Sequence, residues 1–150
     1  MIHKNSVCKT AIFLFLILIS LSMNVQSKET YGSYQAEVLK VIDGDTVKLS
    51  VRIWPKLTQE INLRLKKINT PEKRGKRISD CEKKAGQAAT NYTQRWLKGA
   101  KTVTVSDIQL GKYAGRVLGK LSRDGKDLGE ALIKAGHAKP YAGGKRKPWC

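Results

Sequence analysis

Apolar and polar residues alternate with a period of two in the part of the chain that follows its N-terminal apolar run. The alternation predicts three strands, residues 36–42 (AEVLKVI), 45–53 (DTVKLSVRI) and 59–68 (QEINLRLKKI). A strand with one face buried has this pattern. Asp43-Gly44 predicts a turn after the first strand, and Trp54-Pro55-Lys56 predicts a turn after the second.

From Ser79 the spacing of apolar residues changes to that of a helix. Ser79 and Glu82 have the spacing of a capping box, and Gly99 marks the expected end of the helix. The face expected to be buried consists of small and aromatic residues, namely Ala85, Ala88, Ala89, Tyr92 and Trp96.

Two further strands and a second helix follow. Residues 101–108 (KTVTVSDI) and 115–122 (GRVLGKLS) alternate again, and a helix is expected from Asp127, with Glu130 as its capping partner, to Gly136. Five short strands and two helices predict an α+β fold, in which a five-stranded Greek-key β-barrel of the OB type carries flanking α-helices.

The N-terminal apolar run predicts a secretory signal peptide over residues 1–27. Lys4 and Lys9 precede a short apolar core of eleven residues, 11–21 (AIFLFLILISL), and Val25-Gln26-Ser27 offers a cleavage site. A membrane anchor is the alternative, but a bilayer requires roughly 20 apolar residues. We therefore expect one domain, residues 28–150, exported to the periplasm or the medium, without stable membrane association after the signal is removed.

The chain is strongly basic. Its 29 Lys and Arg residues against 12 Asp and Glu give a net charge of +17, of which the predicted signal accounts for two lysines and no acid. Such a charge predicts an anionic partner: nucleic acid, an acidic envelope surface or anionic lipid. We rank a membrane role last because no segment outside the signal is strongly amphipathic. The tail residues 145–147 (KRK) either assist in holding a polyanion or keep the tail solvated.

Removal of the signal would leave two cysteines, Cys81 and Cys150. An exported chain with one remaining pair predicts a disulfide between the C-terminal tail and the start of the first helix. The alternative is two unrelated thiols.

Two acids flank the first predicted turn of this basic chain. Asp43 and Asp45 are two positions apart, so on a strand both side chains would share one face and offer oxygen ligands to calcium or magnesium. The alternative is a hairpin turn whose acids are solvated.

The segment after the third predicted strand combines a cation with oxygen donors. Cleavage of a phosphodiester requires cations on the non-bridging oxygens, an oriented water and a base. Arg64 supplies a guanidinium, whose fork binds phosphate through parallel hydrogen bonds, and Asn69, Thr70 and Glu72 follow within nine residues. In the alternative, Pro71-Glu72 only ends the strand and the arginine is an ordinary solvated residue.

Three motifs together resemble the staphylococcal nuclease (thermonuclease) family. They are DGDTV at residues 43–47, R-x4-N-T-P-E at residues 64–72 and KYAGR at residues 112–116. In this order they are specific, and the resemblance extends from about Gln35 to Tyr141. The ending GGKRKPWC, with Cys81 upstream, resembles the exported bacterial branch. The resemblance implies a monomeric, calcium-dependent nuclease that hydrolyses DNA with little sequence specificity, with RNA as a second candidate substrate.

The resemblance also implies a metal site. Asp45 becomes a calcium ligand, Thr70 contributes its backbone carbonyl, and Asp43 becomes an acid near the ion. The family has an aspartate ligand where this chain has Asn69, which retains a carbonyl oxygen but removes one negative charge. We therefore expect weaker calcium binding, because affinity follows ligand charge.

The remaining roles concern the substrate. Glu72 has the position of the general base or of a residue that orients the attacking water, and Arg64 and Arg116 have those of the pair that holds the scissile phosphate. Tyr113 and Tyr141 are candidates to contact the nucleotide, although KYAGR has one residue more between Tyr113 and Arg116 than the family prototype. The alternative function is a catalytically weakened OB-fold protein that only binds nucleic acid.

Overall fold

The computed structural model describes residues 31–112 and 115–150. The predicted signal peptide and Tyr113 lie outside the described residues. No helix within the described part of the chain is long and apolar enough to cross a membrane.

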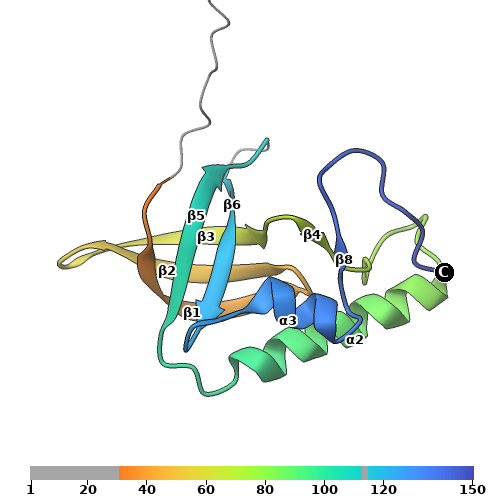
Figure 1. Ribbon diagram of the computed structural model, residues 1–150, viewed down its shortest axis with the longest axis horizontal. Helices are drawn as coiled ribbons and strands as arrows, with labels where there is room; N and C mark the ends of the chain where they lie inside the picture. The colour runs from red at the N-terminus through yellow and green to blue at the C-terminus, as the bar shows by residue number, and fades with distance from the viewer. Residues whose placement is uncertain (1–30, 113–114) are drawn as a thin grey trace, which may run out of the picture.

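Figure 1 shows the strands and helices of the described chain. In chain order they are β1 (Tyr34–Asp43), β2 (Thr46–Trp54), β3 (Leu57–Leu65), β4 (Ile68–Asn69), α2 (Asp80–Leu97), β5 (Val103–Leu110), β6 (Arg116–Arg123), β7 (Lys126–Asp127), α3 (Leu128–Lys134) and β8 (Lys139–Pro140).

Five strands close into a barrel. β1 lies antiparallel between β2 and β5, β2 pairs with β3, and β5 pairs with β6. The barrel closes because β3 and β6 pair in parallel, with Arg64 opposite Leu118. α2 runs along one end of the barrel and packs against β1, while α3 lies beside α2 and packs against β6 (Figure 1). The predicted α+β fold, an OB-type barrel with two flanking helices, is confirmed.

The barrel interior is built from the alternate residues that the sequence pattern picked out. β2 and β3 contribute inward side chains that are at most 5% exposed, and α3 covers the barrel with two leucines. Burial of each such side chain contributes roughly 1.5–3 kcal/mol. The innermost residues are Val47, Leu49, Val51, Leu63, Leu65, Val103, Val105, Leu121, Leu128 and Leu132.

The third strand is shorter than predicted. It ends at Leu65 instead of Ile68, because Lys67 adopts a left-handed backbone conformation (φ 59°) and the Lys66 N–H donates to the Gly119 carbonyl at 2.9 Å. The chain then enters β4, which pairs with β8. The sequence signal for this turn is Lys67, which interrupts the alternation of apolar and polar residues after Lys66.

Helix α2 begins as predicted but buries a different face. Ser79 caps it by accepting from the Glu82 N–H at 3.2 Å, whereas the Glu82 carboxylate accepts from the backbone N–H of Glu72 at 3.3 Å. Ala88, predicted to be buried, is exposed. The face is rotated because the helix packs through its smaller and polar residues against the loops of the barrel. The buried residues are Gly86, Ala89, Thr90, Thr93 and Leu97.

The second helix and the disulfide agree with their predictions. Asp127 accepts from the Glu130 N–H at 2.9 Å, and Gly136, after the helix, has φ 74°. Cys81 and Cys150 are bonded, so the C-terminus lies at the start of α2 (Figure 1).

Candidate active site

The turn between β1 and β2 is held tightly against α2. Gly44 and Asp45 form the turn, and the Thr93 hydroxyl donates to the Gly44 carbonyl at 2.7 Å. A Cβ on Gly44 would lie 2.8 Å from the Cβ of Ala89, closer than side chains approach one another. Glycine therefore lets the turn reach the helix, which fixes the positions of Asp43 and Asp45.

Asp45 is almost completely buried and is surrounded by donors. Its side chain is 3% exposed, and one oxygen accepts from the guanidinium of Arg64 and from the Thr46 hydroxyl at 3.1 Å. The other oxygen accepts from the Thr70 N–H at 3.1 Å. A carboxylate has about four lone-pair sites, so these donors leave acceptor capacity for one more partner.

Arg64 links Asp45 to Asn69. While one nitrogen of its guanidinium bonds to Asp45, another donates to the Asn69 amide oxygen at 3.3 Å. Asn69 and Thr70 are 6% and 3% exposed. The turn after β3 thus brings the predicted oxygen donors next to the predicted phosphate-binding arginine.

Asp43 has a buried carboxylate oxygen, Oδ1, that has no hydrogen-bond partner among the described residues. Its burial, and then the negative charges of Asp45 and Glu72, raise the pKa of Asp43, while a hydrogen bond with Thr46 opposes this rise. A buried carboxylate oxygen without a partner, next to the carboxylate of Asp45, is a place where a cation would lower the electrostatic free energy. The described residues contain no group of three or more His, Cys, Asp or Glu side chains that could hold a metal ion, so backbone and amide oxygens would have to complete the ligand set. Together with the all-oxygen donor set, this fits a hard cation such as calcium.

Glu72 lies on the loop after β4, and residues of α2 contact the backbone of this loop. Its backbone N–H donates to Glu82, and a Cβ on Gly86 would lie 2.6 Å from the Glu72 carbonyl carbon and from the Lys73 nitrogen. Its carboxylate is 37% exposed and bonds to the guanidinium of Arg146. The loop thus presents Glu72 at the surface beside the buried Asp45 cluster.

Sequence reasoning missed two supports of Glu72, namely Gly86 and the carboxylate of Glu82. The signal for Gly86 was present, because glycine within a helix costs roughly 1 kcal/mol relative to alanine and so indicates a packing requirement. Glu82 was interpreted only as a capping residue.

Arg116 begins β6 and is exposed. It pairs with Asn62, while Leu118 pairs with Arg64, so both arginines face outward on adjacent strands. Two residues along a strand correspond to about 7 Å. This register puts the two predicted phosphate-binding arginines on one outer face of the barrel, where the Arg64 side chain is only 14% exposed because its guanidinium bonds to Asp45 and Asn69.

Tyr141 is engaged with backbone groups. Its N–H donates to the Lys67 carbonyl at 2.8 Å, and its hydroxyl donates to the Gly144 carbonyl at 2.7 Å. It thereby joins β8 to the C-terminal tail. Its predicted contact with a nucleotide stays a prediction, as does that of Tyr113.

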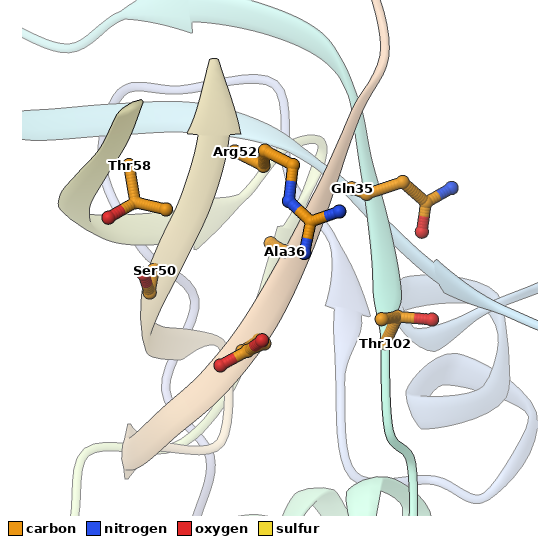
Figure 2. Close-up of a pocket in the computed structure, with 7 residues that line it drawn as sticks. Gln35, Ala36, Ser50, Arg52, Thr58 and Thr102 are labelled. Atoms are coloured by element: carbon orange, nitrogen blue, oxygen red, sulfur yellow. The ribbon is translucent and has the colours of Figure 1, made fainter. Parts of the chain in front are cut away.

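A separate pocket of about 110 Å³ lies where β1, β2 and β3 meet the start of β5 (Figure 2). Figure 2 shows the guanidinium of Arg52 extending from β2 across β1. The pocket lining has a single acid, Glu37, and none of the residues predicted for the site. It offers no counterpart to the carboxylates around Asp45.

The sequence profile of the family described as staphylococcal nuclease homologue matches residues 62–148, which include Arg64, Glu72 and Arg116. The chain belongs to this family. It is a nuclease, a hydrolase of phosphodiester bonds, and its substrate is nucleic acid.

Individual relatives agree with the family. An Escherichia coli protein named as an uncharacterized endonuclease is 29% identical over 84% of this chain and 71% of its own length. An Escherichia coli O157:H7 protein with the same name matches to the same extent. An uncharacterized protein of Methanocaldococcus jannaschii is 28% identical over 75% of this chain and 62% of its own length.

In this nuclease Arg116 and Arg64 lie on neighbouring strands, the first exposed and the second largely buried against Asp45. The carboxylate of Glu72, 37% exposed, stands on the loop after β4. Guanidinium groups can stabilise charge on a phosphate, and a carboxylate can accept a proton.

Proposed function

We propose that this nuclease hydrolyses DNA in a calcium-dependent reaction with little sequence specificity. The observation that carries the proposal is the buried Asp45 carboxylate, held by Arg64 and by the Thr70 N–H beside the exposed carboxylate of Glu72. A purely structural ion pair would not need a second carboxylate on the adjoining loop. The name of the Escherichia coli relatives supports cleavage within a strand.

The oxygens of Asp45 and Asp43, the Thr70 carbonyl and the Asn69 amide are the groups that would hold calcium. When bound, the ion supplies positive charge that polarises the phosphate and lowers the pKa of bound water. The unpartnered Oδ1 of Asp43 supports this assignment. Since Asn69 is neutral, we expect the affinity for calcium to be lower than with aspartate at this position.

The chain's own residues bind the phosphate and accept a proton. Arg64 and Arg116 donate to the non-bridging oxygens of the scissile phosphate. Glu72 orients a water and accepts its proton as the water oxygen bonds to phosphorus, while the bond from phosphorus to the leaving sugar oxygen breaks. That oxygen then takes a proton from solvent. In the free protein an N–H of Arg64 donates to Asp45, and when the substrate binds, this N–H donates to a phosphate oxygen instead.

We also propose that residues 28–150 form one exported, monomeric domain. Export is supported by the disulfide between Cys81 and Cys150, because disulfides persist in the periplasm and outside the cell. The affinity for DNA would come from contacts with the backbone, which carry no base information.

One observation favours a second candidate, a barrel that binds nucleic acid without cutting it. The Asn69 amide oxygen already accepts from Arg64 and is therefore less available to a cation. The groups that a binding protein would not require, Glu72 above all, count against this candidate.

A cleavage assay separates the two. Labelled single-stranded DNA, double-stranded DNA and RNA are incubated with the purified protein across a calcium titration, with a chelator as control. We expect DNA cleavage that rises with calcium and stops with chelator. Tight binding without cleavage at every calcium concentration would establish the second candidate, and cleavage that resists the chelator would remove calcium from the proposal.

A further inference from the structure

The C-terminal tail, residues 141–150, returns to the active site from the far end of the sequence. Figure 1 shows it arching away from β8 and coming back to the start of α2. Along this path the guanidinium of Arg146 bonds to the carboxylate of Glu72, although 74 residues separate them. The tail therefore adds a cation to the site that the motif residues do not supply.

Both ends of the tail are anchored. At its start β8 pairs with β4, and Tyr141 bonds to Lys67 and Gly144. At its end Cys150 is bonded to Cys81. Between these points Lys139 donates to the Pro148 carbonyl at 3.1 Å, and its ammonium lies 4.3 Å from the centre of the Trp149 ring. These contacts hold the tail in one conformation and limit the entropy lost when Arg146 binds a ligand.

Arg146 lies in the electrostatic field of two acids of the site, Glu72 and Asp45. Burial alone would lower its pKa, but the hydrogen bond and charge of Glu72 raise it, and the charge of Asp45 adds to this effect. Its side chain is still 42% exposed. A guanidinium has five N–H donors, so the bond to one carboxylate oxygen leaves donors for an anion from solvent.

We propose that Arg146 is a third phosphate-binding residue of the nuclease. In the free protein it pairs with Glu72; when the nucleic acid binds, it bonds to the phosphate next to the scissile one, and the Glu72 carboxylate becomes available to the attacking water. The disulfide is part of this subsite because it holds the tail against the loop of Glu72. The inference rests on the proposed function, which makes Glu72 the group nearest the reacting water.

The chain provides matched controls for this proposal. Lys145 and Lys147 flank Arg146, are exposed and carry the same charge. Substitution of either removes the same charge from the same tail, so a difference between them and Arg146 reports a specific contact. Arg146→Lys keeps the charge but loses the fork that binds two phosphate oxygens.

The test compares Arg146→Ala and Arg146→Lys with Lys145→Ala and Lys147→Ala, all purified as the full protein and checked for an unchanged Tm. KM and kcat are measured on a short oligodeoxynucleotide, and binding is measured at several salt concentrations without calcium. We expect Arg146→Ala to raise KM and Kd about 10- to 100-fold, the effect of a lost charge-assisted contact. We also expect its salt slope on single strands to fall by about 0.7. The KM and Kd of Arg146→Lys should lie between those of the wild type and Arg146→Ala. Lys145→Ala and Lys147→Ala should change Kd less than about 3-fold.

Reduction of the disulfide gives a second arm. In the wild-type protein it should raise KM, whereas in Arg146→Ala it should add little, because the residue it positions is already absent. Equal effects of Arg146→Ala and Lys145→Ala would overturn the proposal, as would a faster Arg146→Ala variant, which would show that the tail inhibits Glu72. Arg146-dependent binding by a wild-type protein that does not cut would contradict the proposed function and leave the phosphate contact standing.

Discussion

At the residue scale, the charge of the site depends on position 69, where an amide stands beside Arg64. Asn69→Asp would keep an acceptor for the guanidinium and add a negative charge among the donors proposed for calcium. We expect the calcium concentration for half-maximal cleavage to fall several-fold, since affinity rises with ligand charge. An unchanged calcium titration would show that residue 69 does not contact the ion.

Away from the site, Asp107 forms an ion pair with Lys66, and the contribution of this pair to stability depends on pH. Lys66, 11% exposed, donates to the Asp107 carboxylate at 2.7 Å, and this bond lowers the pKa of Asp107. The stabilisation is complete above the unfolded pKa of about 3.9 and is lost as the pH falls through the lower native pKa.

The variant Asp107→Asn tests this ion pair. Asn tolerates the left-handed backbone of this residue, φ 49°, so the fold should be retained. We expect the Tm to be about 1–4 °C lower than wild type at pH 6, and the difference to disappear near pH 2. A difference that stayed constant from pH 6 to pH 2 would contradict the ionic origin of the stabilisation.

At the scale of elements, packing of α2 against the Glu72 loop determines where the proposed base stands. Gly86→Ala places a Cβ 2.6 Å from two backbone atoms of this loop, so the loop must move. We expect a lower Tm and a loss of activity, although alanine normally stabilises a helix interior by roughly 1 kcal/mol over glycine. Ala88→Gly at an exposed position is the control, which should lower the Tm and preserve the specific activity. A Gly86→Ala variant with raised Tm and full activity would contradict this account of the loop.

Periodicity predicted most elements because their buried residues recur at regular spacing, as Val47, Leu49 and Val51 do. Periodicity gave wrong predictions where a contact between residues far apart in the sequence determines where a strand ends or which face of a helix is buried. The strand that ends at Leu65 was predicted to be longer because Lys66 continues the alternation and Ile68 is apolar, although Lys67 interrupts the pattern. The face of α2 was predicted from side-chain size and apolarity, whereas Thr93 is buried to bond the Gly44 carbonyl. Such a face is determined by the turn it packs against, which local patterns do not contain.

At the scale of the whole molecule, the disulfide joins residues 69 positions apart and closes the chain around α2 and the barrel. By restricting the unfolded chain, it should stabilise the fold by about 2–4 kcal/mol. Urea unfolding of the wild type with and without reductant measures this, and Cys150→Ser should match the reduced wild type. Equal unfolding curves for oxidised and reduced wild type would exclude a stabilising role for the bond.

The way distant segments meet in the fold explains which site residues could be predicted from the sequence. Asp45, Arg64, Asn69, Thr70 and Glu72 belong to two short motifs, and the pairing of β2 with β3 and the turn after β3 bring these motifs together. The contact between Glu72 and Arg146 has no local signal. It joins segments 74 residues apart, and the KRK pattern alone favoured a solvated tail as much as a binding role.

In the proposed mechanism Glu72 is the proton acceptor, so the first measurement is the cleavage rate of Glu72→Gln at saturating calcium. Glu60→Gln is the matched control, because Glu60 is an exposed acid of β3 that pairs with Lys48. We predict that Glu72→Gln folds with an unchanged Tm, still binds DNA and cleaves it about 100- to 10,000-fold more slowly, while Glu60→Gln cleaves at the wild-type rate. A near-normal rate in Glu72→Gln would contradict the account and remove this carboxylate from the reaction.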